Sequence, residues 1–353
     1  MEPILYGSTA AGYRVRQQLE AAFAQTVQQE HACAIHSGTV GLFVALLACG
    51  IGAGDEVITV GNSDISTTAA ISQIGAKPII CDILATDYTI DISLVESLIT
   101  SKTRAILPVD LYGHPANVKQ LRGIADQHGL MIVEDAALAT GAQDSGVPVG
   151  AFADVAVFSF AAYKPLGCAG NGAMMVTSNP EIARRLRLLT GYGHDPDQQD
   201  VPAGHQRYLA EGFNVPLDPL QAAIVLVKLP YLAATTARRQ AVAKIYEQGL
   251  ADSPVVTPSF RAESVPTFRS YTILVPRRAS VHQQMLAAGI EVAIHYAPPQ
   301  YHHPVYGGQL ADPAKLPVTE KVAADLLCLP VSPEVSDEEA AFVVETLRGC
   351  LDG

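Results

Sequence analysis

Two charged residues stand where buried strands are expected to end. Lys164 closes the run 155–164, and Asp135 closes the apolar run 130–135. An open α/β sheet places its ligands at the carboxyl ends of its strands. A lysine amine at that edge can form a Schiff base with an aldehyde, and a carboxylate can keep a pyridine nitrogen protonated. Together the pair points to pyridoxal phosphate (PLP) chemistry, although either residue alone is also consistent with an ordinary loop charge.

A second motif could hold a phosphate. Ser37, Gly38 and Thr39 lie between a short apolar segment, 32–36, and a helical pattern at 40–49. A helix N-terminus presents free N–H groups and the positive end of the helix dipole, which favours anions. Gly38 would let a phosphate approach the backbone, and the two hydroxyls can donate hydrogen bonds. The alternative is an ordinary helix N-cap, a position where Ser and Thr are common.

The residues around Lys164 add to this pattern. Ser159 precedes the lysine at the end of the same expected strand, and Gly167, Gly170 and Gly172 follow it. Glycines at such a turn allow the backbone to crowd a ligand. Their spacing differs from the dinucleotide-binding fingerprint, and no strand leads directly into them.

Composition excludes several classes of protein. The net charge of −12 and the lack of a basic cluster argue against nucleic-acid binding. No apolar run approaches the ~18 residues of a membrane span, and no signal peptide is recognised, so a cytoplasmic protein is expected. The six scattered cysteines fit reduced, buried thiols. His295, His302 and His303 have no carboxylate or thiolate partner at useful spacing, so we expect no metal site.

Strand and helix patterns alternate along the first part of the chain. This alternation predicts a mostly parallel sheet covered by helices. The chain after about residue 240 shows a different pattern, which predicts a large domain at 1–240 and a smaller α+β domain at 241–353. Strands are expected at 32–36, 56–60, 78–82, 105–111, 131–135, 155–160, 173–177, 270–275 and 290–295. Helices are expected at 14–28, 40–49, 67–74, 91–99, 118–128, 181–190, 217–248 and 337–347, and a polar loop at 195–204.

The order of several short segments resembles the DegT-type sugar aminotransferases, which are PLP enzymes of the aspartate aminotransferase (type I) fold. The resemblance implies that fold for this chain: a large domain with a mostly parallel central sheet, and a smaller C-terminal domain. The matching segments are 37–39, 54–58, 75–78, 111–113, 134–137, 158–160 with Lys164, 212–214, 220–223 and 294–296.

The resemblance also implies roles for residues near the cofactor. Lys164 would be the Schiff-base lysine and would shuttle a proton between substrate and cofactor. Asp135 would pair with the pyridinium nitrogen. Gly38, Thr39 and Ser159, together with Ser37, would hold the phosphate.

Other implied roles involve a second subunit and the substrate. Asn214 would reach the phosphate from the neighbouring subunit, which implies a homodimer with shared sites. His295 and Tyr296 would lie near the substrate entrance.

Several positions depart from the family pattern. Asp64 takes the place of an aromatic residue that stacks on the cofactor ring, and Leu138 replaces a Gln or His that helps to position the cofactor. Pro216 replaces an arginine that often binds substrate, and Asn171 replaces a frequent acidic residue. These changes are consistent with an altered substrate, with altered chemistry, or with decay toward a binding role.

The sequence therefore predicts a PLP-dependent aminotransferase. It would move an amino group from glutamate or glutamine to a keto-sugar, a keto-cyclitol or a related intermediate. Burial is expected to lower the pKa of the Lys164 amine so that it can act as a base near neutral pH. A PLP-dependent dehydratase and a non-catalytic PLP-binding protein remain as alternatives. The intact Lys164 argues against decay and against the dehydratases of this family, in which histidine takes its place.

Overall fold

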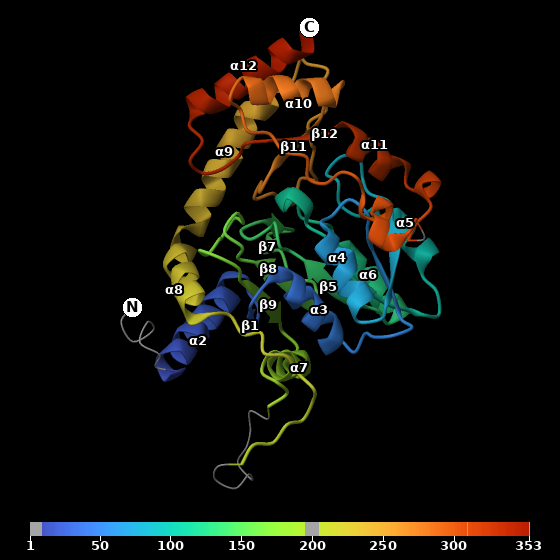
Figure 1. Ribbon diagram of the computed structural model, residues 1–353, viewed down its shortest axis with the longest axis vertical. Coiled ribbons are helices and arrows are strands. Elements are labelled where there is room, and N and C mark those ends of the chain that lie inside the picture. The colour runs from blue at the N-terminus through green and yellow to red at the C-terminus, as the bar shows by residue number, and fades with distance from the viewer. Residues whose placement is uncertain (1–8, 195–204, 309, 353) are drawn as a thin grey trace.

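A seven-stranded sheet forms the centre of the molecule (Figure 1). The computed structural model describes residues 9–194, 205–308 and 310–352, so the predicted loop 195–204 lies outside the described residues. The order across the sheet is β1 (His31–Ile35), β9 (Ala173–Thr177), β8 (Val155–Ser159), β5 (Met131–Asp135), β4 (Thr103–Ile106), β2 (Glu56–Val60) and β3 (Lys77–Cys81). Strands β3, β2, β4, β5 and β8 run parallel, and β9 is antiparallel to both of its neighbours, β8 and β1.

Both faces of this sheet are buried, which explains why its strands are apolar at nearly every position. Alternate residues of a strand point to opposite faces. In β8, Val155 and Val157 join the core beneath α3 (Gly38–Ala48), whereas Ala156 and Phe158 join a second core with α2 (Thr9–Thr26). The remaining helices of this part are α4 (Ile65–Gln73), α5 (Ile92–Leu98), α6 (Val118–His128) and α7 (Pro180–Thr190).

A long helical connector leads to the C-terminal part. It comprises α8 (Pro219–Lys228), a short 3-10 turn and α9 (Leu232–Leu250). Figure 1 shows this connector rising from beside α2 toward α12 (Asp337–Asp352). By length and composition Pro219–Leu250 could cross a membrane, and 28% of its most apolar window is buried. That test is also passed by core helices of soluble proteins, and α8 packs on α2 while α9 packs on α12.

The C-terminal part has a core of its own. It contains α10 (Arg278–Ala287), α11 (Pro317–Asp325), α12 (Asp337–Asp352) and a two-stranded sheet of β11 (Tyr271–Leu274) and β12 (Leu326–Leu329). Their buried side chains form one cluster with those of α9. Three two-residue strands, β6 (Gln143–Asp144), β7 (Val147–Pro148) and β10 (Ser264–Val265), pair across the two parts. Residue 240, the predicted domain boundary, lies inside α9. We propose that the two domains divide along this helix.

Two predicted strands need correction. The segment 290–295 is not a strand, because its pairing with β12 is limited to an isolated bridge between Ala293 and Cys328. β12 itself was not predicted, since its four apolar residues directly follow the helix α11 and carry no alternation. The strand predicted at 105–111 ends at Ile106, after which one bridge joins Val109 to Asp135.

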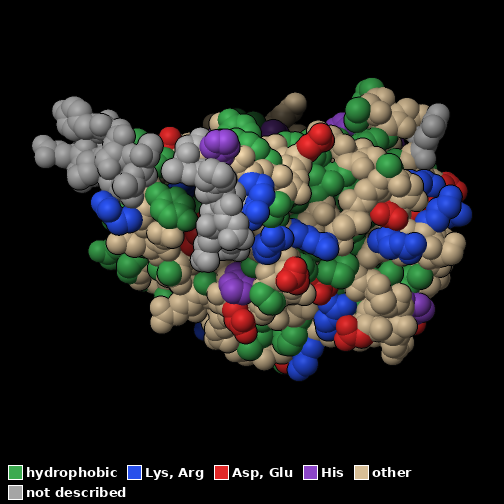
Figure 2. Space-filling view, turned by 90° about the horizontal axis from the view of Figure 1, so that it is seen from below, with side chains coloured by type: hydrophobic (Ala, Val, Ile, Leu, Met, Phe, Trp, Pro, Cys, Tyr) green, Lys and Arg blue, Asp and Glu red, His purple; other side chains and the backbone are tan. Residues whose placement is uncertain are grey.

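Charges of both signs are mixed on the surface around α7. Figure 2 shows this face, where Lys and Arg side chains lie among Asp and Glu side chains. Arg187 of α7, for example, forms an ion pair with Glu20 at 3.1 Å. This arrangement is consistent with the prediction that the protein does not bind nucleic acid.

Candidate active site

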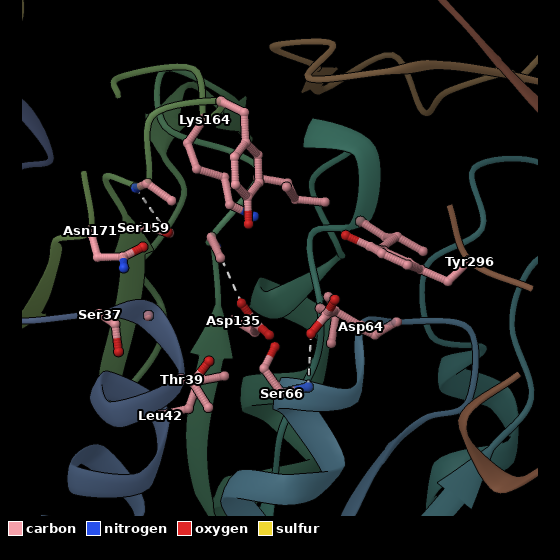
Figure 3. Close-up of a pocket in the computed structure, with 18 residues that line it drawn as sticks. Ser37, Thr39, Leu42, Asp64, Ser66, Asp135, Ser159, Lys164, Asn171 and Tyr296 are labelled. Atoms are coloured by element: carbon pink, nitrogen blue, oxygen red, sulfur yellow. Dashed lines mark hydrogen bonds between the residues drawn. The ribbon is translucent and has the colours of Figure 1, made fainter. Parts of the chain in front are cut away.

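One cavity lies at the carboxyl edge of β5 and β8 and brings most of the predicted residues together (Figure 3). It forms there because the strand ends, the N-termini of α3 and α4 and the turn after β8 meet at this edge. The predicted residues that line it are Ser37, Gly38, Thr39, Asp64, Asp135, Leu138, Ser159, Lys164 and Tyr296. Asn214 and His295 are not among its lining residues.

Asp135 is held rigidly at the end of β5. Its Oδ2 accepts a hydrogen bond from Thr67 Oγ1 at 3.0 Å, and its Oδ1 accepts one from the Ala137 amide at 3.2 Å. Burial raises the pKa of the Asp135 carboxyl, whereas these two donors and the charge of Lys164 act in the opposite direction. A cationic group placed against Asp135 would therefore favour its ionised form. Thr67 was not predicted from the sequence.

Lys164 lies in the turn that follows β8. Its backbone amide donates to the Ala161 carbonyl at 2.8 Å, and its Nζ lies 5.0 Å from the centroid of the Tyr163 ring. Burial lowers the pKa of the Lys164 amine to about 8, and Arg269 also lowers it, while Asp135 and Asp64 raise it. A substantial fraction of this amine is thus neutral, and able to accept a proton, near physiological pH.

The glycines after Lys164 pack against the chain itself. A Cβ atom on Gly167 would lie 2.3 Å from the Ala162 carbonyl oxygen, and one on Gly172 would lie 2.8 Å from the Leu217 side chain. Gly167 and Gly172 therefore allow the lysine turn to fold tightly on itself and against Leu217. That the glycine-rich turn also lets the backbone crowd a ligand stays a prediction.

The N-terminus of α3 faces the other side of the cavity. Ser37 caps this helix, since its Oγ accepts from the Val40 amide at 3.4 Å. A Cβ on Gly38 would lie 3.3 Å from Ser159 Cβ and 3.4 Å from its Oγ, so glycine permits the close approach of the two segments. The N-cap alternative is correct for Ser37, yet Gly38, Thr39 and Ser159 still border the cavity beside a helix N-terminus.

Asp64 has a structural role that the sequence did not reveal. Its Oδ1 accepts from the Ser66 amide at 2.9 Å and so caps α4, and its backbone carbonyl accepts from Gln300 Nε2. Its side chain also lines the cavity, so the carboxylate stands where a stacking aromatic was expected. Leu138 is buried and contributes an apolar wall.

The C-terminal part supplies the outer wall. Tyr296 lines the main cavity, and His295 and Arg269 line two cavities that adjoin it. The rings of His295 and Tyr296 stack with centroids 5.1 Å apart. Burial lowers the pKa of His295, as do the charges of Arg269 and Lys164, which favours the neutral imidazole. Arg269 was missed, because no sequence motif surrounds it.

Asn214 lies away from the cavity of its own chain. It is exposed, and its backbone forms an isolated bridge with Gly191. Elsewhere, His302 Nε2 lies 2.7 Å from Glu320 Oε1, a carboxylate partner that sequence spacing did not indicate. Within residues 9–194, 205–308 and 310–352, no group of three or more His, Cys, Asp or Glu side chains is arranged to hold a metal.

The residues present fit PLP. The cavity offers a carboxylate at one end, a helix N-terminus with a glycine and hydroxyls at the other, and a lysine amine with a lowered pKa between the segments that carry them. A Cβ at Gly38 would narrow the place next to Ser159 where a phosphate would approach.

Comparisons with known proteins identify the family of this chain. Residues 3–348 match the model of the DegT/DnrJ/EryC1/StrS aminotransferase family, and the chain belongs to that family. It is 40% identical, over 93% of its length, to the erythromycin biosynthesis sensory transduction protein EryC1 of Saccharopolyspora erythraea, of which the match covers 88%. It is also 40% identical, over 93% of its length, to dTDP-3-amino-3,4,6-trideoxy-alpha-D-glucose transaminase of Streptomyces venezuelae, of which the match covers 85%.

Solved structures show the same fold. The crystal structure of S. venezuelae DesV, in complex with a ketimine intermediate, superposes with a TM-score of 0.91 at 36% identity and covers 100% of this chain and 96% of its own. An aminotransferase of the same family from Brucella abortus gives a TM-score of 0.89 at 30% identity, covering 96% and 90%. The predicted family and fold class are confirmed, and with them an aminotransferase that uses PLP.

Proposed function

We propose that this protein moves an amino group from glutamate or glutamine to the keto group of a sugar or a closely related intermediate. The observation that carries the proposal is the placement of Lys164 and Asp135 in one cavity beside the N-terminus of α3. When bound there, PLP supplies an electron sink for the bonds around the reacting carbon. We propose that Asp135 holds the protonated ring nitrogen and that Gly38, Thr39 and Ser159 hold the phosphate.

Lys164 would move the proton. Because its pKa is lowered to about 8, the free amine of Lys164 can accept a proton at Nζ from the Cα of the donor. The resulting ammonium can give a proton to the acceptor carbon in the second half of the reaction. Leu138 and Tyr296 help to exclude water from the surroundings of Lys164, because both side chains border the cavity. The hydrogen bonds from Thr67 and Ala137 fix the orientation of Asp135.

Transfer of labelled nitrogen tests this function. The PLP-loaded protein is incubated with 15N-labelled L-glutamate or L-glutamine and a keto-sugar panel, and the amino-sugar product is analysed by mass spectrometry. Lys164→Ala and Asp135→Asn should lower turnover by about 100-fold or more, whereas the exposed Lys244→Ala should not. A Lys164→Ala protein that still transfers nitrogen would refute the proposal.

The names of relatives support a nucleotide-linked keto-sugar as the acceptor. A relative of Acidithiobacillus ferrooxidans, 36% identical, acts on UDP-N-acetyl-3-dehydro-alpha-D-glucosamine, and the S. venezuelae relative is named for a dTDP-linked amino sugar. We therefore place dTDP- and UDP-linked keto-sugars first in the panel, as part of amino-sugar biosynthesis. The losses of an aromatic at Asp64 and of an arginine at Pro216 are reasons to include sugars without a nucleotide.

We propose that two copies of the chain complete each other's sites. Asn214 lies outside its own cavity, and Val227 of α8 (70% exposed) and Tyr231 of the following 3-10 turn (65% exposed) present apolar surface. Mixing inactive Lys164→Ala and Asn214→Ala proteins tests the proposal. Subunit exchange should restore about one quarter of wild-type activity, because half of the dimers would carry one intact site. Mixtures that stay inactive after proven exchange would contradict shared sites.

A regulatory role is the second candidate. EryC1 is named a sensory transduction protein, and a 35% identical relative of Geobacillus stearothermophilus is named a pleiotropic regulatory protein. Cofactor binding without nitrogen transfer from any donor would favour this role. A dehydrated product without nitrogen transfer would favour the dehydratase alternative. For each of these roles we propose a cytoplasmic location, which cell fractionation can test.

A further inference from the structure

An arginine from the C-terminal part reaches the site next to Lys164. Arg269 precedes β11, and its Cζ lies 5.6 Å from the centroid of the Tyr163 ring. Lys164 Nζ lies 5.0 Å from the same ring. Arg269 and Tyr163 line two cavities that adjoin the main one, in each case together with His295. The guanidinium and the reactive amine are therefore neighbours across one aromatic side chain.

The guanidinium of Arg269 lacks an anionic partner. Its Nη1 donates to Ser270 Oγ at 3.2 Å, and its Nε is buried without a hydrogen-bond acceptor. In the described part of the chain, no carboxylate lies within 4.0 Å of its nitrogens. A buried donor without an acceptor is costly, and guanidinium groups match carboxylates with paired hydrogen bonds. Arg269 is thus ready to accept an anionic ligand.

A second guanidinium borders one of these cavities. Arg239 of α9 is only 8% exposed, donates from Nη1 to the Val331 carbonyl at 2.8 Å and to the Phe268 carbonyl at 3.4 Å, and has a buried Nε without a partner. Burial and, to a smaller extent, the like charge of Arg269 lower the pKa of Arg239 to about 10. An anion between the two cations would offset their like charges.

The cavity has space for a ligand and an excess of positive charge. Its volume is about 540 Å³. Lys228, Arg239 and Arg269 line it against two carboxylates, Glu291 and Glu334, both on exposed residues. Lys228 donates to the Gly167 carbonyl, so this amine also stabilises the turn that carries Lys164.

We propose that Arg269 binds the α-carboxylate of the amino-acid donor. This inference rests on the proposed aminotransferase function. Every amino-acid donor carries a carboxylate on the same carbon that gives its proton to Lys164, so a cation is needed beside the lysine. The anionic groups of a nucleotide-linked sugar are remote from its keto carbon and do not require this position. The basic cavity that leads toward Arg239 would receive the donor's side chain.

Kinetics of the two half-reactions test the proposal. Arg269→Met should raise KM for glutamate about 10- to 100-fold, with a smaller change in kcat and less than about 3-fold change in KM for the keto-sugar. The KM of Arg269→Lys for glutamate should lie between those of the wild type and Arg269→Met, because a lysine keeps the charge but not the paired donors. Arg278→Met is the matched control, since Arg278 is half-buried in the same part of the chain and donates to the Ala323 carbonyl.

A binding measurement separates this inference from the proposed function. Glutarate, a dicarboxylate without an amine, is titrated calorimetrically into PLP-loaded protein, and inorganic phosphate is titrated in parallel. Glutarate should bind wild type and Arg278→Met and should bind Arg269→Met at least about 10-fold more weakly. If wild type bound glutarate through Arg269 but transferred no nitrogen, the function would fail and the carboxylate site would stand.

Three results would overturn the assignment of Arg269. The first is an unchanged KM for glutamate in Arg269→Met together with unchanged glutarate binding. The second is an increase in KM for the keto-sugar alone, which would assign Arg269 to the acceptor. The third is stronger binding of phosphate than of glutarate that is lost in Arg269→Met, which would assign the site to a phosphate group.

Discussion

Thr67 donates its hydroxyl proton to Asp135 across 3.0 Å, and Ser63 Oγ lies 2.8 Å from the same threonine hydroxyl. Because the Thr67 proton is used on Asp135, the Ser63 hydroxyl must donate to Thr67. A chain of two hydroxyls therefore orients the carboxylate at the end of β5. Both threonine and serine are buried, so water does not replace them.

Removing this hydroxyl should weaken cofactor binding. Thr67→Val keeps the shape of the side chain but withdraws one hydrogen bond from a buried carboxylate, a contribution of about 1.5–3 kcal/mol. We expect the Kd for PLP, measured by fluorescence titration, to rise about 10- to 100-fold. Ser72→Ala, at an exposed position of the same helix, is the control and should leave the Kd unchanged. An unchanged Kd in Thr67→Val would show that Asp135 needs no such support.

The lowered pKa of Lys164 predicts how its reactivity depends on pH. Only the neutral amine is nucleophilic, so with a pKa of about 8 its labelling should rise steeply between about pH 7 and 9 and then level off. The measurement is pulse labelling of the PLP-free protein with an amine reagent, followed by peptide mass spectrometry. Lys244, exposed on α9, is the internal reference for the labelling reaction.

Arg269 should influence the same titration. Its positive charge lowers the pKa of Lys164, so Arg269→Met should move the labelling profile of Lys164 to higher pH. Arg278→Met should not move it. A profile that is the same in all three proteins would mean that the two groups are too well screened to interact.

Asp64 combines a helix cap with a charge in the cavity, and two substitutions separate these roles. Asp64→Ser keeps a capping oxygen, so the free energy of unfolding should change little, whereas Asp64→Ala should lose about 1 kcal/mol. Since the Asp64 charge raises the pKa of Lys164, both variants should label Lys164 at lower pH. Chemical denaturation and the labelling assay provide the two measurements. Equal free energies of unfolding in the two variants would show that the Asp64 side chain does not stabilise α4 as a cap.

Gly38→Ala should affect the cofactor more than the fold. The added Cβ would lie 3.3 Å from Ser159 Cβ and would occupy the approach to the N-terminus of α3. We expect weaker PLP binding, by fluorescence titration, without loss of stability in the PLP-free protein. Gly123→Ala is the matched control, because a Cβ there meets nothing within 4 Å and should stabilise helix α6 by about 0.5–1 kcal/mol. Unchanged PLP binding in Gly38→Ala would argue against a phosphate at this helix.

Local sequence patterns were sufficient for the strand that ends at Asp135 and for the strand that precedes the turn with Lys164. β5 and β8 are short apolar runs that end in polar residues, and a parallel sheet brings such ends to one edge. The positions of Ser37, Gly38 and Ser159 followed from the same rule. These residues are predictable because their role depends on their own strand or helix.

Arg269 and Thr67 could not be predicted in this way. Arg269 reaches Lys164 only because α9 carries the C-terminal part back over the sheet, which no local pattern records. Thr67 lies inside α4, and its importance depends on the position of Asp135 in another element. The false strand at 290–295 has the same cause, since β12 pairs with β11 and leaves Ala293 with a single bridge.

The path of α9 has a consequence for how this protein could change its specificity. Apart from Tyr296, the lining of the main cavity comes from residues 37–171, whereas Arg269, Ser270 and His295 of the adjoining cavities follow α9. The residues proposed to hold the cofactor and the arginine proposed to bind the donor are thus encoded in different stretches of the gene, joined through one helix. Recombination within the codons of α9 would exchange the segment that contains Arg269 and His295 between relatives while leaving Lys164 and Asp135 in place.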